Sequence, residues 1–143
     1  QPVGEFDILA LVAGEMKVPT ILISGDSKAI EQAGTNMPST HTVSTKYSIG
    51  TDGALCVHPD KICEQLRDET KRALKNVAAI EPSQISGPTQ LTIRLRDVSL
   101  APRLEWIPGI KKTGDAVFEF TGSNMKAIAN IVYGVATLVE ARF

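Results

Sequence analysis

The chain has 143 residues, of which 43% are hydrophobic and 22% charged, and its formal net charge is -1. A chain of this length can bury a core of its own, because domains of this size hide about two thirds of the surface of the unfolded chain. The interleaved acidic and basic residues give no electrostatic footprint for nucleic acid or an anionic membrane. We therefore expect neither as a partner.

The chain is expected to be soluble and cytoplasmic. No apolar run reaches the roughly 20 residues that span a bilayer, and the front has no basic-then-apolar layout typical of a signal peptide. Cys56 and Cys63 are the two cysteines of the sequence. Their spacing matches neither a zinc knuckle nor a disulfide framework, so we interpret them as reduced, mostly structural thiols.

The front of the chain predicts a buried helix, a strand and a second helix. Residues 3–16 are hydrophobic nearly all round, which is typical of a helix packed between layers. Residues 18–24 are a β-branched apolar run, which predicts a strand covered on both faces. A tight exit follows into a helix over residues 27–33, where Asp26 or Ser27 can cap the free amide groups.

Residues 40–46 predict a weaker strand and residues 54–57 another, joined by a glycine-containing loop over residues 48–53. A surface helix then begins at His58, because proline and an acid follow it at positions that favour a helix start. One face of this helix is expected to cover the sheet and carries Cys63, Leu66, Thr70, Ala73, Leu74 and Val77.

The second part of the chain reads as strands followed by a helix. Residues 91–95 and 116–120 alternate apolar with polar side chains, which predicts strands with one wet face. A short helical segment near residues 100–106 separates them, and a last helix is predicted over residues 123–142. Its apolar face carries Met125, Ile128, Val132, Val135 and Val139.

The order of these elements predicts a layered α/β protein with a mixed sheet. Residues 81–88 have two prolines, a glycine and two serines, and form the most linker-like stretch. We assign residues 1–80 to the main α/β part and residues 89–143 to a smaller α/β lobe.

The chain is poor in groups that carry catalysis. Its two histidines, His41 and His58, have no HExxH motif, nucleophilic serine or phosphate loop around them, and we interpret each as a surface or capping histidine. Residues 24–26 (SGD) either face a site at the end of a strand or form a turn with a capping Asp26. Glu5 is either a first-turn acid stabilised by the helix dipole, by about 0.3–1 kcal/mol, or an oxygen ligand for zinc.

Several segments, in order, give the chain a family resemblance. They are residues 1–5 (QPVGE), the apolar helix, residues 18–26 (VPTILISGD), residues 54–59 (ALCVHP), the strand at residues 91–95 and residues 107–109 (IPG). Together they resemble the carboxyl-terminal half of the zinc-dependent D-aminopeptidases of the dipeptide-transport-operon type. The collinear order carries the resemblance, since no single motif is very specific.

The resemblance implies a three-layer α/β/α fold, completed by an amino-terminal half that this chain lacks. It implies that Glu5 completes a two-zinc cage whose other ligands, and the acid/base histidine, lie in that half. No catalytic residue is assigned to this chain, and no substrate-binding residue is identified. The implied reaction is hydrolysis of the amino-terminal peptide bond of short D-amino-acid peptides, by a water that two zinc ions activate.

The resemblance also implies partners. We expect tight association with the amino-terminal half, either cut from a precursor before Gln1 or encoded separately, and a large ring-like oligomer. The loop at residues 50–53 (GTDG) is neutral to acidic where family members often carry a base, so stereospecificity and substrate remain open. Two alternatives are a non-catalytic scaffold or peptide-binding subunit, and a metal-dependent amidase acting on non-peptide amides.

Overall fold

The computed structural model describes residues 2–50 and 53–140. The chain divides into two compact units, Gln1–Gln84 and Ile85–Phe143. Expectations that concern Gln1, Thr51, Asp52 and the end of the last helix at residue 142 lie outside the described residues. Within the described part, no helix combines the length and hydropathy needed to cross a membrane.

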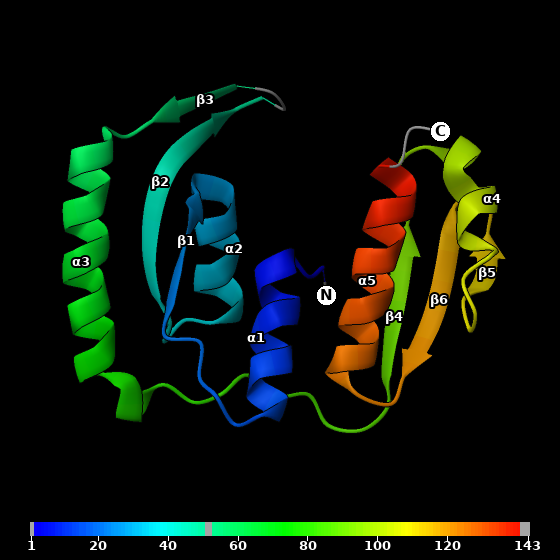
Figure 1. Ribbon diagram of the computed structural model, residues 1–143, viewed down its shortest axis with the longest axis horizontal. Helices are drawn as coiled ribbons and strands as arrows, with labels where there is room; N and C mark the ends of the chain where they lie inside the picture. The colour runs from blue at the N-terminus through cyan, green and yellow to red at the C-terminus, as the bar shows by residue number, and fades with distance from the viewer. Residues whose placement is uncertain (1, 51–52, 141–143) are drawn as a thin grey trace. The chain divides into compact units, whose positions relative to one another are not determined.

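Unit 1 is a three-layer α/β/α arrangement around a mixed sheet, as predicted. The sheet has the order β1-β2-β3, in which β1 (Leu22–Asp26) runs parallel to β2 (His41–Ile49) and β3 (Gly53–Cys56) runs antiparallel to it. The helix α3 (Pro59–Lys75) lies on one side of this sheet, and α1 (Glu5–Glu15) and α2 (Ser27–Asn36) lie on the other (Figure 1).

The helix α1 forms where the apolar run predicts it, and it packs against α2. The core between them contains Ala10, Ile23, Ala33 and Met37, with Phe6 and Ile30 packed at its edge. Leu9 on the outer side of α1 is 48% exposed in this chain. The expectation that α1 is covered on every side includes a partner half, and it stays a prediction. The inward positions of α1 include a charged residue, Asp7, which is buried.

The strand β1 lies later in the sequence than its apolar run predicts. Its ladder with β2 begins at the pair Leu22 and His41. The preceding residues are held by the turn that enters β2, since Thr40 Oγ1 donates to the Thr20 carbonyl oxygen at 2.8 Å and the His41 N–H donates to the Ile21 carbonyl oxygen at 3.1 Å. The expected covering on both faces is also incomplete, because Ser24 is exposed.

The helix α3 begins where it is predicted, and its inner face differs from the prediction. The His58 Nδ1 atom accepts a hydrogen bond from the Asp60 N–H at 3.3 Å, so His58 is a capping histidine. Ala73 is fully buried, and Glu69, Leu66 and Ile62 are partly buried one, two and three turns before it. Three residues expected on this face are instead exposed, namely Cys63, Leu74 and Val77.

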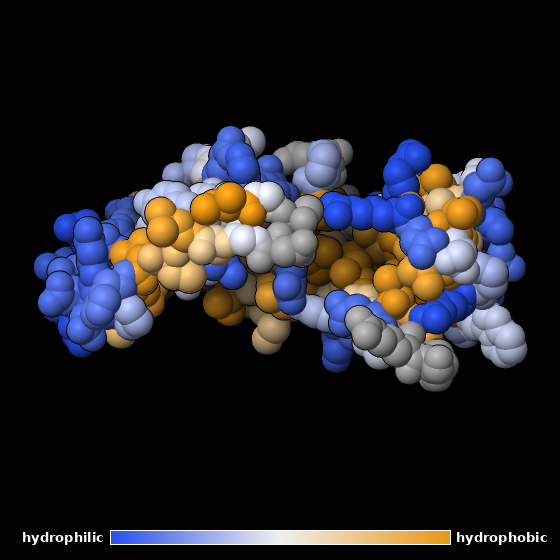
Figure 2. All heavy atoms as spheres, turned by 90° about the horizontal axis from the view of Figure 1, so that it is seen from above, coloured by the Kyte–Doolittle hydropathy of each residue, from blue (hydrophilic) through white to orange (hydrophobic). Residues whose placement is uncertain are grey.

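The end of β2 and the strand β3 form a two-stranded arm, defined here as residues 46–49 and 53–56. Every residue of the arm is exposed. Its apolar side chains include Tyr47, Ile49 and Leu55, which are 50%, 65% and 64% exposed, and apolar surface over this arm is visible in Figure 2. Cys56 lies on this exposed arm, and Cys63 on α3 is exposed too, so neither free thiol is in the core.

Unit 2 is an antiparallel sheet with a helix on it. The sheet has the order β4-β6-β5, with bounds Thr89–Arg94 for β4, Val117–Gly122 for β6 and Lys111–Gly114 for β5. The helix α5 (Met125–Glu140) packs on β6 and β4, and its buried residues include Met125, Ile128 and Val135 as predicted. The short helix α4 (Ala101–Leu104) follows a 3-10 turn at Val98–Leu100.

The core of unit 2 contains Ala101, Leu104, Phe118 and Val135. The alternation in β4 and β6 is confirmed, because Leu91 and Phe118 are buried while Thr92 and Arg94 are exposed. The strand β5 was not predicted. Its four residues, KKTG, are all exposed, so hydrophobic alternation gives no signal for it.

Candidate functional site

The candidate metal ligand, Glu5, is the first residue of α1. Its N-cap is Gly4, which has extended backbone dihedral angles, and the Ile8 N–H donates to the Gly4 carbonyl oxygen at 3.3 Å to start the helix. The Glu5 side chain is exposed. A carboxylate in this position is reachable by an ion or another chain, and the helix gives its backbone a fixed mount.

The first turn of α1 is fixed by the carboxylate of Asp7. Asp7 Oδ2 accepts hydrogen bonds from the Gly4 N–H at 2.7 Å and from Gln32 Nε2 at 3.0 Å. Asp7 Oδ1 accepts a third from Asn36 Nδ2 at 3.0 Å. The bond to Gly4 is one half of a capping box, and the other two bonds join α1 to α2. The sequence analysis missed Asp7, although its position three residues after the N-cap is a recognisable signal.

The described part of the chain can supply one zinc ligand, the carboxylate of Glu5. Carboxylate oxygens are accepted zinc ligands, and Glu5 presents one at the surface. Across residues 2–50 and 53–140, no group of three or more His, Cys, Asp and Glu side chains is arranged to hold a metal ion. A complete cage would need ligands from outside the described part of the chain.

The two histidines have separate structural partners. His58 caps α3, as described above. His41 lies in β2, and its Nδ1 atom is 2.6 Å from Glu69 Oε1, with side-chain exposures of 19% for His41 and 21% for Glu69. The interpretation of His41 as a surface or capping histidine is therefore wrong. Sequence periodicity could not reveal this pair, because its members are joined only by the packing of α3 on β2.

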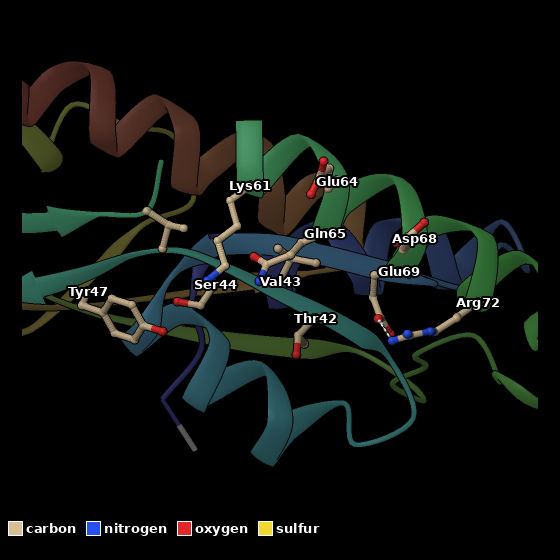
Figure 3. A pocket seen from close by; sticks show the side chains of 11 residues that line it. Thr42, Val43, Ser44, Tyr47, Lys61, Glu64, Gln65, Asp68, Glu69 and Arg72 are labelled. Carbon is tan, nitrogen blue, oxygen red and sulfur yellow. Dashed lines mark hydrogen bonds and ion pairs between the residues drawn. The ribbon is translucent and has the colours of Figure 1, made fainter. Parts of the chain in front are cut away.

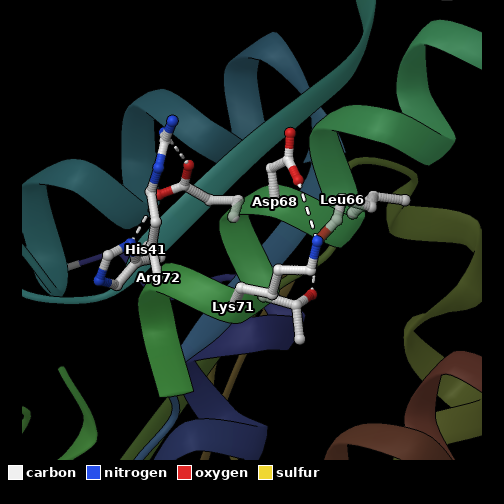
Figure 4. Close-up of polar contacts among 7 residues, drawn as sticks. His41, Leu66, Asp68, Lys71 and Arg72 are labelled. Atoms are coloured by element: carbon white, nitrogen blue, oxygen red, sulfur yellow. Dashed lines mark hydrogen bonds and ion pairs between the residues drawn. The ribbon is translucent and has the colours of Figure 1, made fainter. Parts of the chain in front are cut away.

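Glu69 is held on its other oxygen by Arg72, whose Nη1 atom lies 2.8 Å from Glu69 Oε2. Figure 4 shows His41 and Arg72 beside one another, together with the exposed pair of Asp68 and Lys71. The hydrogen bond with His41 is the main reason that the pKa of Glu69 is lowered, and the hydrogen bond and charge of Arg72 lower it further against the opposing effect of burial. The carboxylate is thus stabilised in its ionised form.

A pocket of about 520 Å³ lies between β2 and α3. Its lining includes Ser44 and Tyr47 from β2 and Lys61, Gln65 and Glu69 from α3, and Figure 3 shows how these side chains lie around it. Acidic and basic groups are mixed in the lining, which contains no imidazole or thiol. The pocket therefore offers mainly polar and charged contacts.

Asp26, the last residue of β1, caps the start of α2. Asp26 Oδ1 accepts hydrogen bonds from the Lys28 N–H at 2.8 Å and from the Ala29 N–H at 3.1 Å. These two backbone hydrogen bonds, that of Ala29 first, lower the pKa of the Asp26 carboxyl. The structure confirms Asp26 as a capping residue, and it places residues 24–26 at the end of β1 where a turn was one of the two interpretations.

Comparisons with known proteins identify the class of protein to which this chain belongs. A model of the peptidase M55 family, described as D-aminopeptidase, matches residues 1–133. The chain therefore belongs to the D-aminopeptidase family, and the predicted resemblance is confirmed.

The chain is similar to a curated protein and to a solved structure, both from Bacillus subtilis, the curated protein from strain 168. A D-aminopeptidase is 29% identical over 126 residues, which are 87% of this chain and 46% of the relative. The solved structure is that of the Zn-dependent D-aminopeptidase DppA, a self-compartmentalizing protease. The match covers 100% of this chain and 53% of the DppA chain, with a TM-score of 0.88 and 26% identity. The chain thus spans about half the length of these relatives.

Proposed function

We propose that this chain is the carboxyl-terminal half of a zinc-dependent aminopeptidase that hydrolyses the amino-terminal peptide bond of short D-amino-acid peptides. The family match over residues 1–133 supports the peptidase class, and the relative DppA is described as Zn-dependent. The observation that carries the role of this chain is the exposed Glu5 carboxylate at the rigid start of α1.

In this proposal Glu5 is one zinc ligand, and the remaining ligands come from an amino-terminal half in a second chain. The chain spans only 46% and 53% of its two relatives, which supports a missing half of similar size. When bound, two zinc ions would supply a Lewis acid and bring the pKa of water toward about 7. The contribution of this chain is to hold the Glu5 carboxylate in place and to offset part of the cation charge.

The half-exposed apolar side chains of unit 1 support an association with that other half. Leu9 on α1 and Val18 before β1 are 48% and 50% exposed, so both apolar side chains are accessible to a partner chain. The description of DppA as self-compartmentalizing supports a large homo-oligomer that encloses its active sites.

The test is metal analysis and turnover of a Glu5→Ala variant, expressed together with the amino-terminal half. Loss of one ligand should remove most of the bound zinc and most of the hydrolysis of D-alanyl peptides. The melting temperature should stay within a few degrees of the parent, because the Glu5 side chain is exposed. Glu15→Ala is the matched control, since it removes the same side chain from the other end of the same helix.

Unchanged zinc content and turnover in Glu5→Ala would refute the assignment. About two zinc ions per pair of halves in the native assembly support the peptidase, and none supports the alternative of a non-catalytic scaffold or peptide-binding subunit. That alternative is favoured by one observation, the lack of any three-residue metal cluster in the described part of the chain. Comparing D-alanyl peptides with their L forms and with simple amides separates an aminopeptidase from an amidase.

A further inference from the structure

The buried carboxylate of Asp7 is an unusual feature of the described chain. Asp7 is 5% exposed. Among residues 2–50 and 53–140, it is the polar or charged residue that is buried. Burying a charge is costly unless hydrogen bonds replace its hydration, and Asp7 receives three of them. A helix that only needed packing against α2 could carry an apolar residue at this position.

The three donors hold the start of α1 from two sides. One donor is the backbone N–H of Gly4, which immediately precedes Glu5, and the other two are the amide groups of Gln32 and Asn36 on α2. Glu5 lies between Gly4 and Asp7 in the chain. The backbone on both sides of Glu5 is therefore tied to a single carboxylate, which is tied in turn to a second helix.

Gly4 is also part of this arrangement. A Cβ atom added at Gly4 would lie 3.2 Å from Gln32 Oε1 and 3.1 Å from Phe6 Cε1. The amide of Gln32 thus packs against the Cα atom of Gly4 while it donates to Asp7. A side chain at position 4 would therefore press on the same amide that donates to Asp7.

We propose that Asp7 is a positioning residue for Glu5, acting through the Gly4 N–H and through Gln32 and Asn36. This inference rests on the proposed role of Glu5 as a zinc ligand. Hydrogen-bond partners that orient a metal ligand typically change metal affinity by about 10–100-fold when they are removed. A ligand held by such a network needs less ordering when the metal binds, because its backbone is already fixed.

The experiment compares the zinc affinity and the metal-free melting temperature of four variants, each expressed with the amino-terminal half. Zinc affinity is measured by competition with a chelator. Asp7→Ala removes all three acceptor contacts and should weaken zinc binding about 10–100-fold. In Asp7→Asn one side-chain oxygen can still accept from Gly4 and Gln32, so the affinity should stay within about threefold of the parent.

Ala33→Gly is the structural control. Ala33 is fully buried in the same core between α1 and α2, and its methyl side chain carries no hydrogen-bonding group. This variant should lower the melting temperature and leave the zinc affinity unchanged. The fourth variant, Gln32→Ala, removes one donor from Asp7 and the amide beside Gly4, and it should weaken zinc binding in the same direction as Asp7→Ala by a smaller factor.

The outcomes separate the possible roles. A parent-like zinc affinity in Asp7→Ala, with only a lower melting temperature, overturns the inference and leaves Asp7 as a structural cap. Equal losses in Asp7→Asn and Asp7→Ala also overturn it, because the charge and not the hydrogen bond to Gly4 would then matter. If Asp7→Ala does not fold, a parent-like affinity in Gln32→Ala overturns it.

A fifth variant, Glu5→Gln, distinguishes this inference from the proposed function. Loss of zinc in Glu5→Gln together with parent affinity in Asp7→Ala overturns the positioning role alone. Parent zinc content in Glu5→Gln overturns the proposed function, and the inference with it.

Discussion

His41 on β2 and Glu69 on α3 lie 2.6 Å apart, from Nδ1 to Oε1, and connect the strand to the helix that covers it. Both side chains are about four fifths buried, so this pair is less screened by water than the surface pairs of α3. Arg72 binds the other oxygen of Glu69. The pair thereby links two elements that are 28 residues apart in the sequence.

The first prediction concerns acid stability. The pKa of Glu69 is lowered in the folded chain, mainly by the hydrogen bond with His41, so its contribution to stability is present above the ordinary pKa of 4.5. This contribution is lost as the pH falls from about 4.5 through the lower folded-state pKa, because the unfolded chain then binds the proton more readily. Glu69→Gln should therefore show a smaller loss of stability than the parent over this range.

The measurement is the melting temperature of each variant with the amino-terminal half, between pH 7 and the acid limit of the fold. Glu64→Gln, which removes an exposed carboxylate from the same helix, is the control and should follow the parent. An unchanged acid dependence in Glu69→Gln would show that the pair contributes nothing to stability.

The second prediction concerns the cap of α2. Asp26→Ala removes the acceptor for the Lys28 and Ala29 N–H groups and should lower the melting temperature by a few degrees. Asp26→Asn should retain most of the stability, since an amide oxygen also caps a helix well. Thermal unfolding followed by circular dichroism checks both variants, and equal melting of all three proteins would contradict the cap.

The third prediction is that two helical glycines respond in opposite ways to alanine. A Cβ atom at Gly14 in α1 would lie 1.6 Å from the backbone oxygen of Ser83, so Gly14→Ala must displace a backbone segment and destabilise the fold. At Gly34 in α2 nothing lies within 4 Å of the added atom. Gly34→Ala should stabilise by about 0.4–1 kcal/mol, because alanine restricts the unfolded chain.

Denaturant unfolding of the two variants measures this difference. The close contact at Gly14 would be disproved by a Gly14→Ala protein as stable as the parent. A destabilised Gly34→Ala protein would mean that another segment of the native assembly covers α2 at this point.

The fourth prediction concerns the core of unit 2. Leu104 is fully buried beside Phe118 and Val135, so Leu104→Ala should cost about 2–5 kcal/mol of the free energy of unfolding. Trp106, two residues later, is 86% exposed, and Trp106→Ala should change the free energy by less than about 0.5 kcal/mol. Hydrogen exchange of the β6 amides, which pack on this core, provides the measurement.

A large effect of Trp106→Ala would show that this side chain is buried in the native assembly. A small effect of Leu104→Ala would contradict the packing of α4 described here. The two residues are compared because Leu104 ends α4 and Trp106 follows it two residues later, with opposite burial.

Much of the fold was readable from local patterns in the sequence. The helix start at His58 and Pro59, the alternation around Leu91 and Phe118, and the apolar face of α5 are set by interactions within a few residues. These are the features in which the spacing of side chains and the geometry of the element coincide. The collinear family segments likewise required no coordinates.

The remaining features depended on contacts between elements. The bounds of β1 shifted because β2 begins its ladder at Leu22, and β5 was invisible because four exposed residues carry no hydrophobic period. The inner face of α3 includes Glu69, a charged residue that the apolar pattern did not assign to this face. It lies there because its carboxylate contacts His41 on β2.

The sequence by itself determined the α/β class through local periodicity and the family through its collinear segments, and the family resemblance implies Glu5 as the candidate ligand. Only the tertiary structure decided that Asp7 is buried, that Gln32 and Asn36 donate to it, and that the Gly4 N–H completes the set. The physical reason is that hydrogen bonds between α1 and α2 join residues 25 and 29 positions apart, and no local pattern records which helix faces meet.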